Sequence, residues 1–282
     1  MFLDAHNHLQ DARFAGTQPA LLAPCAEAGV SRMVVNGTCE SDWPAVLELD
    51  RRSSLVLPSF GLHPWYVHER TSDWQAALVR HLDAVPSAIG EIGLDRWILD
   101  RPANWAMALS GRPSGAPAAL AEQEVVFLWQ LHLAAERNLP ASIHCLQAWG
   151  RLHELLREHP RPARGFLLHS FGGPVEMVPA LARLGAYFSF SGYFAHERKG
   201  RQRETFRHIP LDRLLLETDA PDQLPPAALI SHPLAEAPTG KPLNHPANLP
   251  AIYRFLADFL GESEACLVAR VAENFHRLFA GL

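Results

Sequence analysis

Two histidines near the start of the chain have a spacing that could bind a metal ion. The sequence opens with MFLDAHNHLQ, so His6 and His8 follow a short apolar run and lie two residues apart. Residues two apart on a strand point to the same side. Because the chain has 15 histidines among 282 residues, such a pair also arises by chance. The pair predicts a metal site only if further ligands come from elsewhere in the chain.

Other polar residues stand at the ends of apolar runs in the same way. Glu91 lies in AIGEIGLD, His144 ends ASIH, His169 ends FLLH, and Asp219 follows LLLET. Taken alone, each such histidine is more often a hydrogen-bonded core residue, and each such acid is more often a helix cap or a loop residue. Six residues in equivalent positions instead predict that four imidazoles and two carboxylates meet around metal ions.

The chemistry of this set favours two divalent ions. Neutral imidazole and carboxylate suit Zn²⁺, Mn²⁺ or Fe²⁺, whereas Mg²⁺ prefers oxygen ligands. A catalytic zinc ion keeps about three protein ligands, so six ligands fit two ions about 3.5–4 Å apart that share a carboxylate. Without cations, Glu91 and Asp219 would repel each other and lose hydration. The expected cofactors are two divalent metal ions per chain, with Mg²⁺, Mn²⁺ and Zn²⁺ as candidates.

Short apolar runs alternate with helical patterns eight times along the chain. Runs such as RMVVNG and RLLLETD are continuously apolar, which is typical of parallel strands covered by helices. We expect strands at 2–5, 32–36, 55–60, 88–91, 141–144, 165–169, 186–190 and 214–217. Helices are expected at 18–28, 42–52, 73–84, 122–138, 150–159, 174–184, 202–208 and 246–260. This order predicts an α/β fold of the (β/α)₈ TIM barrel type, with a doubly wound open sheet as the alternative. Barrel enzymes place their chemistry at the C-terminal ends of the strands, where the six candidate ligands stand.

Length and composition limit the classes of protein that the chain could be. With 282 residues, of which 48% are hydrophobic, the sequence fits one domain over 1–282. Its net charge of −5 gives no general attraction for nucleic acid. It has neither a signal-peptide pattern nor an apolar run of about 18 residues that could cross a membrane. Its four cysteines lack C-x-x-C spacing. We therefore expect a cytoplasmic protein with no membrane contact and no obligate protein partner.

Two segments interrupt the alternation and could reach a substrate. Segment 96–119, RWILDRPANWAMALSGRPSGAPAA, is too long for an ordinary connection, which predicts an insertion loop with a function. Segment 196–208, HERKGRQRETFRH, carries five Arg and Lys residues against two Glu. Arg96 and Arg198 are therefore candidates for binding an anionic substrate, although such charges are more often only a solvated surface.

Seven motifs of the chain resemble one known family. DAHNHL, GLHP, GEIGLD, LPASIHC, LLHSFGG, LLLETDAP and NFHRLF run in this order from residue 4 to residue 279. They resemble the TatD-like metal-dependent deoxyribonuclease/hydrolase family of the amidohydrolase superfamily. The resemblance covers nearly the whole chain and implies a metallo-dependent hydrolase barrel with a divalent metal site.

The resemblance also implies a role for each candidate residue. Two pairs of histidines would each hold one ion, namely His6 with His8 and His144 with His169. Glu91 would bridge the two ions. Asp219 would bind the first ion and take the proton from the attacking water, and His63 of GLHP would contact the substrate.

The sequence departs from the family pattern on the substrate side. Members usually read I-H-x-R-x-A after strand five, whereas this chain has Leu146 in place of the arginine that would bind phosphate. The first hypothesis is a deoxyribonuclease that cleaves phosphodiester bonds of DNA ends by metal-activated water. An amidohydrolase acting on a small amide, lactone or ester is the alternative, and a non-catalytic metal-binding scaffold is a third hypothesis.

Overall fold

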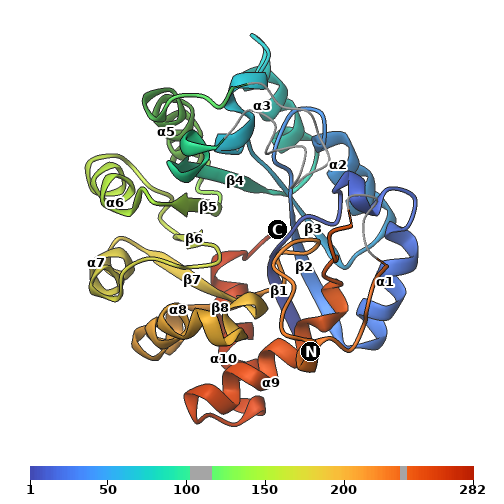
Figure 1. Ribbon diagram of the computed structural model, residues 1–282. Helices are drawn as coiled ribbons and strands as arrows, with labels where there is room; N and C mark the ends of the chain where they lie inside the picture. The colour runs from blue at the N-terminus through green and yellow to red at the C-terminus, as the bar shows by residue number, and fades with distance from the viewer. Residues whose placement is uncertain (102–115, 236–239) are drawn as a thin grey trace.

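The computed structural model describes residues 1–101, 116–235 and 240–282, and it contains eight parallel strands. Each strand pairs with the next one along the chain, and the sheet curls around a central axis (Figure 1). The strands are β1 (Phe2–Asn7), β2 (Val30–Asn36), β3 (Val56–Phe60), β4 (Ala88–Asp95), β5 (Ala141–Leu146), β6 (Phe166–Leu168), β7 (Ala186–Ser191) and β8 (Leu214–Glu217). This order confirms the predicted (β/α)₈ TIM barrel, since a doubly wound sheet would reverse its strand order.

Hydrogen bonds close the seam between β8 and β1. Just after β8, the backbone N–H of Asp219 donates to the carbonyl of His6 at 3.0 Å. The hydroxyl of Thr218 donates to the buried carboxylate of Asp4 at 2.6 Å. The seam therefore places two segments that lie more than two hundred residues apart, and that carry predicted ligands, side by side.

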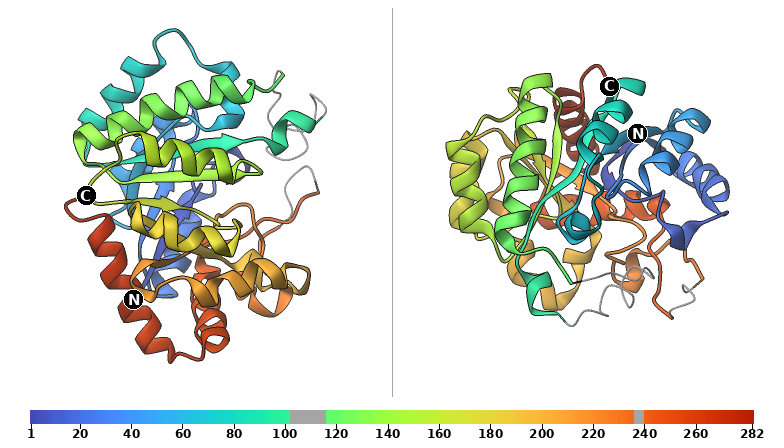
Figure 2. Two further views of the ribbon diagram at one scale, coloured as in Figure 1. Left: turned by 90° about the vertical axis from the view of Figure 1, so that its left-hand side faces the viewer. Right: turned by 90° about the horizontal axis from the view of Figure 1, so that it is seen from above.

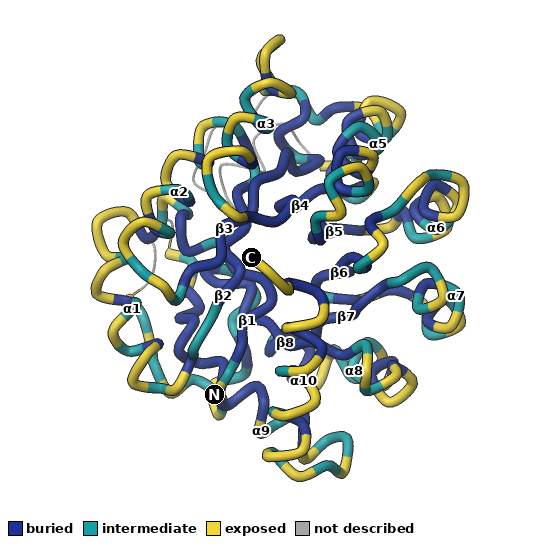
Figure 3. The backbone as a smooth tube through the Cα atoms, turned by 180° about the vertical axis from the view of Figure 1, so that it is seen from behind, coloured by how far each residue is buried: buried dark blue, intermediate teal, exposed yellow. Residues whose placement is uncertain are grey.

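An outer ring of helices covers the barrel (Figure 2). Their apolar residues recur at helical spacing, as in α6, where Leu152, Leu155 and Leu156 are buried. The tube in Figure 3 shows buried strands inside and exposed turns of helix outside. The helices are α1 (Gln18–Glu27), α2 (Trp43–Arg52), α3 (Trp74–Ala84), α5 (Leu120–Arg137), α6 (Trp149–Glu158), α7 (Val178–Arg183), α8 (Gly200–Thr205), α9 (Leu249–Leu260) and α10 (Glu264–Leu278).

Strand β4 is longer than predicted, which changes the position of Glu91. The strand continues to Asp95 and stays paired with β5 along this length. Gly93 permits the pairing, because a Cβ at this position would lie 2.0 Å from the carbonyl oxygen of His144. Glu91 therefore lies inside the strand and is buried.

The insertion loop predicted at 96–119 is described only at its two ends. Residues Trp97–Asp100 form a 3₁₀ turn directly after β4, and residues 102–115 lie outside the described part. Across the described residues, none of the helices combines the length and apolar character that a membrane crossing requires.

Candidate metal centre

Glu91 lies between two pairs of histidines and turns one carboxylate oxygen toward each pair. Its Oε1 atom is 3.1 Å from Nδ1 of His144 and 2.7 Å from Nε2 of His169. Its Oε2 atom is 3.2 Å from Nε2 of His8 and 3.7 Å from Nε2 of His6. The carboxylate is thus shared between strands on opposite sides of the barrel, as a bridging ligand would be.

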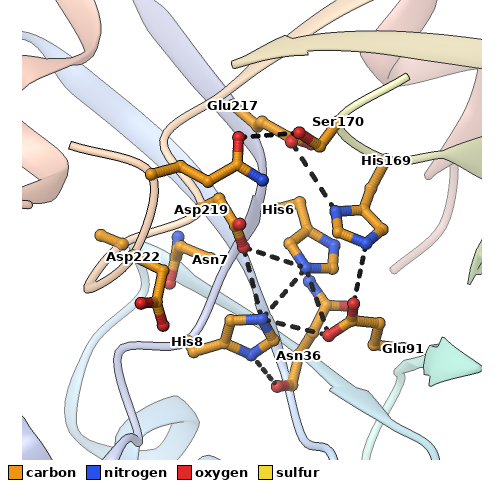
Figure 4. Close-up of polar contacts among 12 residues, drawn as sticks. His6, Asn7, His8, Asn36, Glu91, His169, Ser170, Glu217, Asp219 and Asp222 are labelled. Atoms are coloured by element: carbon orange, nitrogen blue, oxygen red, sulfur yellow. Dashed lines mark hydrogen bonds and ion pairs between the residues drawn. The ribbon is translucent and has the colours of Figure 1, made fainter. Parts of the chain in front are cut away.

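Asp219 joins the pair formed by His6 and His8. Its Oδ1 atom is 3.6 Å from Nε2 of His6 and 3.5 Å from Nε2 of His8, and the two imidazole nitrogens are 3.2 Å apart. Figure 4 shows these side chains and Glu91 converging on one point. Ligand atoms about 2.1 Å from a common ion stand roughly 3.0–3.4 Å from each other. The separations observed here come close to that range.

Hydrogen bonds to the outer nitrogens set the tautomers of two histidines. Nδ1 of His8 donates to the carbonyl of Asn36 at 2.8 Å, and Nε2 of His144 donates to the carboxylate of Asp95 at 3.0 Å. The inner nitrogen of each neutral ring therefore carries a lone pair, and both lone pairs face Glu91. Lone pairs and carboxylate oxygens directed at one another need a cation between them, so the donor set fits a metal ion.

The other two histidines also have polar partners behind them. Nδ1 of His6 lies 2.7 Å from the hydroxyl of Ser142. Nδ1 of His169 faces Oε1 of Glu217 at 3.7 Å, and neither of these two buried atoms has a hydrogen-bond partner among the described residues. The second carboxylate oxygen of Glu217 accepts a hydrogen bond from Ser189. Partners of this kind orient the rings that bind metal ions.

The acids and histidines of this cluster shift one another's pKa values. Burial would raise the pKa of Glu91, but His63 and His169 hold it well below its usual range. Burial would lower the pKa of His8, but its hydrogen bonds to Asp219 and Glu91 raise it well above its usual range. Glu91 also raises the pKa of His169 to about 10 against the effect of burial. The carboxylates therefore favour protonated rings at His8 and His169, and a metal cation would satisfy the same negative charge.

The structure brings all six predicted ligands together. Of the three residues predicted to contact the substrate, only His63 touches this cluster in the structure. His63 lies beside the cluster, where its Nδ1 accepts the N–H of Trp65 and its Nε2 donates to Glu91 at 3.3 Å. Arg96 is exposed directly after β4. Arg198 is exposed and donates to the hydroxyl of Tyr193 at 3.1 Å. The roles of these residues toward a substrate remain predictions.

Sequence reasoning did not single out the outer partners Asp95, Ser142 and Glu217. Asp95 and Ser142 stand four and two residues from a predicted ligand on the same strand, and Glu217 ends β8 two residues before Asp219. This spacing was visible in GEIGLD, ASIH and LLLETD. A search for polar residues at that spacing would have found them.

The chain is similar to proteins of one family over nearly its whole length. The family model described as TatD related DNase matches residues 3–280. The 3'-5' ssDNA/RNA exonuclease TatD of Escherichia fergusonii is 34% identical over 278 residues, which cover 96% of either chain. The protein of the same name from Escherichia coli K12 is 33% identical over 278 residues, again 96% of either chain. The crystal structure of YJJV, a TatD homologue from Escherichia coli K12, has a TM-score of 0.81 at 26% identity and covers 99% of this chain and 97% of that one.

Proposed function

The chain belongs to the TatD-related DNase family of metal-dependent hydrolases, and on this premise we propose that it is an exonuclease with two divalent ions that degrades single-stranded DNA or RNA. The relatives named 3'-5' ssDNA/RNA exonuclease TatD support this choice of substrate. One observation carries the proposal, namely that the two oxygens of Glu91 each face a separate pair of histidines.

The residues divide into two groups of ligands. His6, His8 and Asp219 would hold one ion, and His144 and His169 would hold the other. Glu91 would bridge them. When bound, two divalent ions supply Lewis-acid polarisation of the phosphoryl oxygen and lower the pKa of an attacking water. Zn²⁺ and Mn²⁺ suit a set of four imidazoles better than Mg²⁺ does.

Two side chains at the C-terminal end of the barrel would take up the proton of water and hold the bridging carboxylate. The contacts of Asp219 to the histidines run through Oδ1, which leaves Oδ2 to accept the proton of water. His63 donates from Nε2 to Glu91, which keeps the bridging carboxylate in place beside the reacting phosphate. Asp219 as the general base and Glu91 as the bridging carboxylate are therefore the proposed catalytic residues.

The path of the substrate toward this site belongs to the same proposal. Arg96 and Arg198 are exposed cations that would contact the phosphates of the strand. All four cysteines are free thiols, which supports a reducing, cytoplasmic location. No observation favours hydrolysis of an amide, lactone or ester, or a non-catalytic scaffold, and the donor set is chemically complete.

Metal analysis combined with a panel of substrates tests the proposal. The protein as purified is analysed for metal, and then assayed on a single-stranded oligonucleotide beside esters, lactones and amides. We expect about two divalent ions per chain and release of mononucleotides from the 3' end, abolished by a chelator and restored by metal. Hydrolysis confined to an ester, lactone or amide would overturn the proposed substrate, and one tightly bound ion per active chain would overturn the bridged pair.

A further inference from the structure

A trough of about 660 Å³ lies next to the metal centre, and the proposed chemistry does not use it. Leu146 and Trp149 line it where β5 leads into α6. The loop after β6 contributes Gly173, and α8 contributes Arg201. Because Leu146 stands two residues beyond the proposed ligand His144, the trough begins at the edge of the candidate centre.

The inner wall of the trough is apolar and aromatic. The side chain of Leu146 is 40% exposed, and only Met1 and Val125 among the described large apolar residues are also exposed. The half-buried indole of Trp149 packs edge-on against Phe171, with ring centroids 4.9 Å apart. An aromatic ring held in this way offers a flat surface at little entropic cost.

A glycine keeps this wall open. A Cβ on Gly173 would lie 2.8 Å from the ring of Phe171 and 3.0 Å from the ring of Trp149. Only glycine lets the loop after β6 lie against both rings. Ser170 anchors the start of the same loop, because its hydroxyl donates to the side chain of Gln223 at 2.7 Å. The wall is thus built by the fold and does not depend on an adjustable side chain.

The rim of the trough carries one arginine, Arg201, together with two exposed acids, Glu176 and Glu204. Arg201 is exposed and forms no ion pair with any described residue, whereas its neighbour Glu204 pairs with Arg207. A flat apolar wall with a guanidinium at its edge complements a nucleotide, whose base is a π-system and whose phosphate accepts from arginine. The volume falls within the range of small-molecule sites, roughly 300–1,000 Å³.

We propose that this trough is a nucleobase subsite, which receives a base of the strand whose phosphodiester lies at the metal centre. The inference rests on the proposed function, because it assumes a single-stranded nucleic acid at that centre. The aromatic wall would bind the base by stacking, which tolerates any base sequence. Arg201 would contact the phosphate attached to the same nucleotide.

Cleavage of oligonucleotides with one abasic residue tests the subsite. Stacking of one base on an aromatic ring is worth roughly five- to 150-fold in affinity. At one position near the cleaved bond, an abasic residue should therefore raise KM at least about fivefold and change kcat little. Trp149→Ala and Leu146→Arg should reduce this penalty to less than about twofold. Val125→Arg adds the same charge at another exposed apolar residue and should keep the full penalty.

Binding of mononucleotides to the metal-loaded protein separates this inference from the proposed function. Wild type should bind thymidine 5'-phosphate more tightly than 2-deoxyribose 5-phosphate, and Trp149→Ala should remove the difference. Cleavage without an abasic penalty at any position would overturn the subsite and keep the nuclease. Base-dependent binding without cleavage would overturn the nuclease and keep the subsite. Neither cleavage nor base-dependent binding would overturn both.

Discussion

The carboxylate of Asp95 accepts a hydrogen bond from Nε2 of His144 at 3.0 Å. It also accepts one from the indole N–H of Trp65 at 2.6 Å, so the acid is fixed from a second side. Since Nε2 of His144 carries the proton, the lone pair on Nδ1 faces Glu91. Asp95 therefore sets both the tautomer and the orientation of a proposed metal ligand without touching the ion.

Removal of Asp95 should weaken metal binding more than it weakens the fold. Asp95→Ala takes away the acceptor of His144, and partners of this kind are worth about 10- to 100-fold in metal affinity. Asp95→Asn keeps an oxygen that can accept and should lose less. Titration of chelator-treated protein with Mn²⁺ measures both variants. Asp42→Asn is the control, because it alters a half-buried carboxylate that accepts from Thr38 instead. Unchanged affinity in Asp95→Ala would contradict the assigned role.

The metal-free protein should lose stability as the pH rises from about 6.5 toward about 10. Against the effect of burial, Glu91 raises the pKa of His169 to about 10, above the value of about 6.5 expected in the unfolded chain. Such a group stabilises the fold fully below about pH 6.5 and loses this contribution as the pH rises toward 10, at up to about 1.4 kcal/mol per pH unit.

Thermal unfolding in the presence of a chelator checks this dependence. His169→Asn removes the titrating ring and should flatten the profile over the same pH range. His153→Asn changes another histidine, which is half-buried on α6, and should leave the slope unchanged. If the stability of the wild-type protein in chelator stays constant through this pH range, His169 does not bind the stabilising proton.

The barrel and the convergence of the six candidate ligands were predictable because both depend on local patterns. An apolar run that ends in a polar residue, as before His144 or His169, marks a strand end without any knowledge of the fold. The parallel order of the strands then brings these ends to one mouth. Strand β4 was predicted too short, because GEIGLD contains two glycines and reads as a turn, whereas Gly93 serves the close approach to β5.

Local patterns could mark the outer polar residues, but they could not show which histidine each of them contacts. Ser142 on β5 contacts His6 on β1, so this pair forms across the barrel. Glu217 at the end of β8 faces His169, which follows β6, so β7 lies between the two strands concerned. Which strand faces which across the interior depends on the tilt and closure of the barrel, and no single segment of sequence carries that information.

Arg13 joins the loop after β1 to the loop after β8, and its loss should destabilise the seam of the barrel. Its side chain is 7% exposed and lies 2.9 Å from the carboxylate of Asp11 and 2.5 Å from that of Asp222. Arg13→Ala leaves two acids without this partner, and partial exposure of Asp222 offsets some of the loss. We expect a decrease of about 1–3 kcal/mol in the free energy of unfolding.

Urea unfolding of three variants separates this effect from ordinary loss of charge. Arg13→Lys keeps one charge but cannot contact both acids with a planar fork, so its stability should be intermediate. Arg80→Ala removes an exposed arginine paired with Asp73, which should change stability by less than about 0.5 kcal/mol. Equal losses in Arg13→Ala and Arg80→Ala would rule out a special role at the seam.

Asp219→Asn should remove most of the turnover and leave the fold intact. The amide keeps an oxygen at the position that faces His6 and His8, but it can no longer accept the proton of water. Loss of a general base lowers kcat by roughly 10²- to 10⁴-fold. Because an amide is also a weaker ligand than a carboxylate, kcat is measured at saturating metal, together with the metal content and the unfolding midpoint. Asp212→Asn changes an exposed acid in the same way and should retain full activity. A rate within a few-fold of wild type in Asp219→Asn would assign the proton to another group.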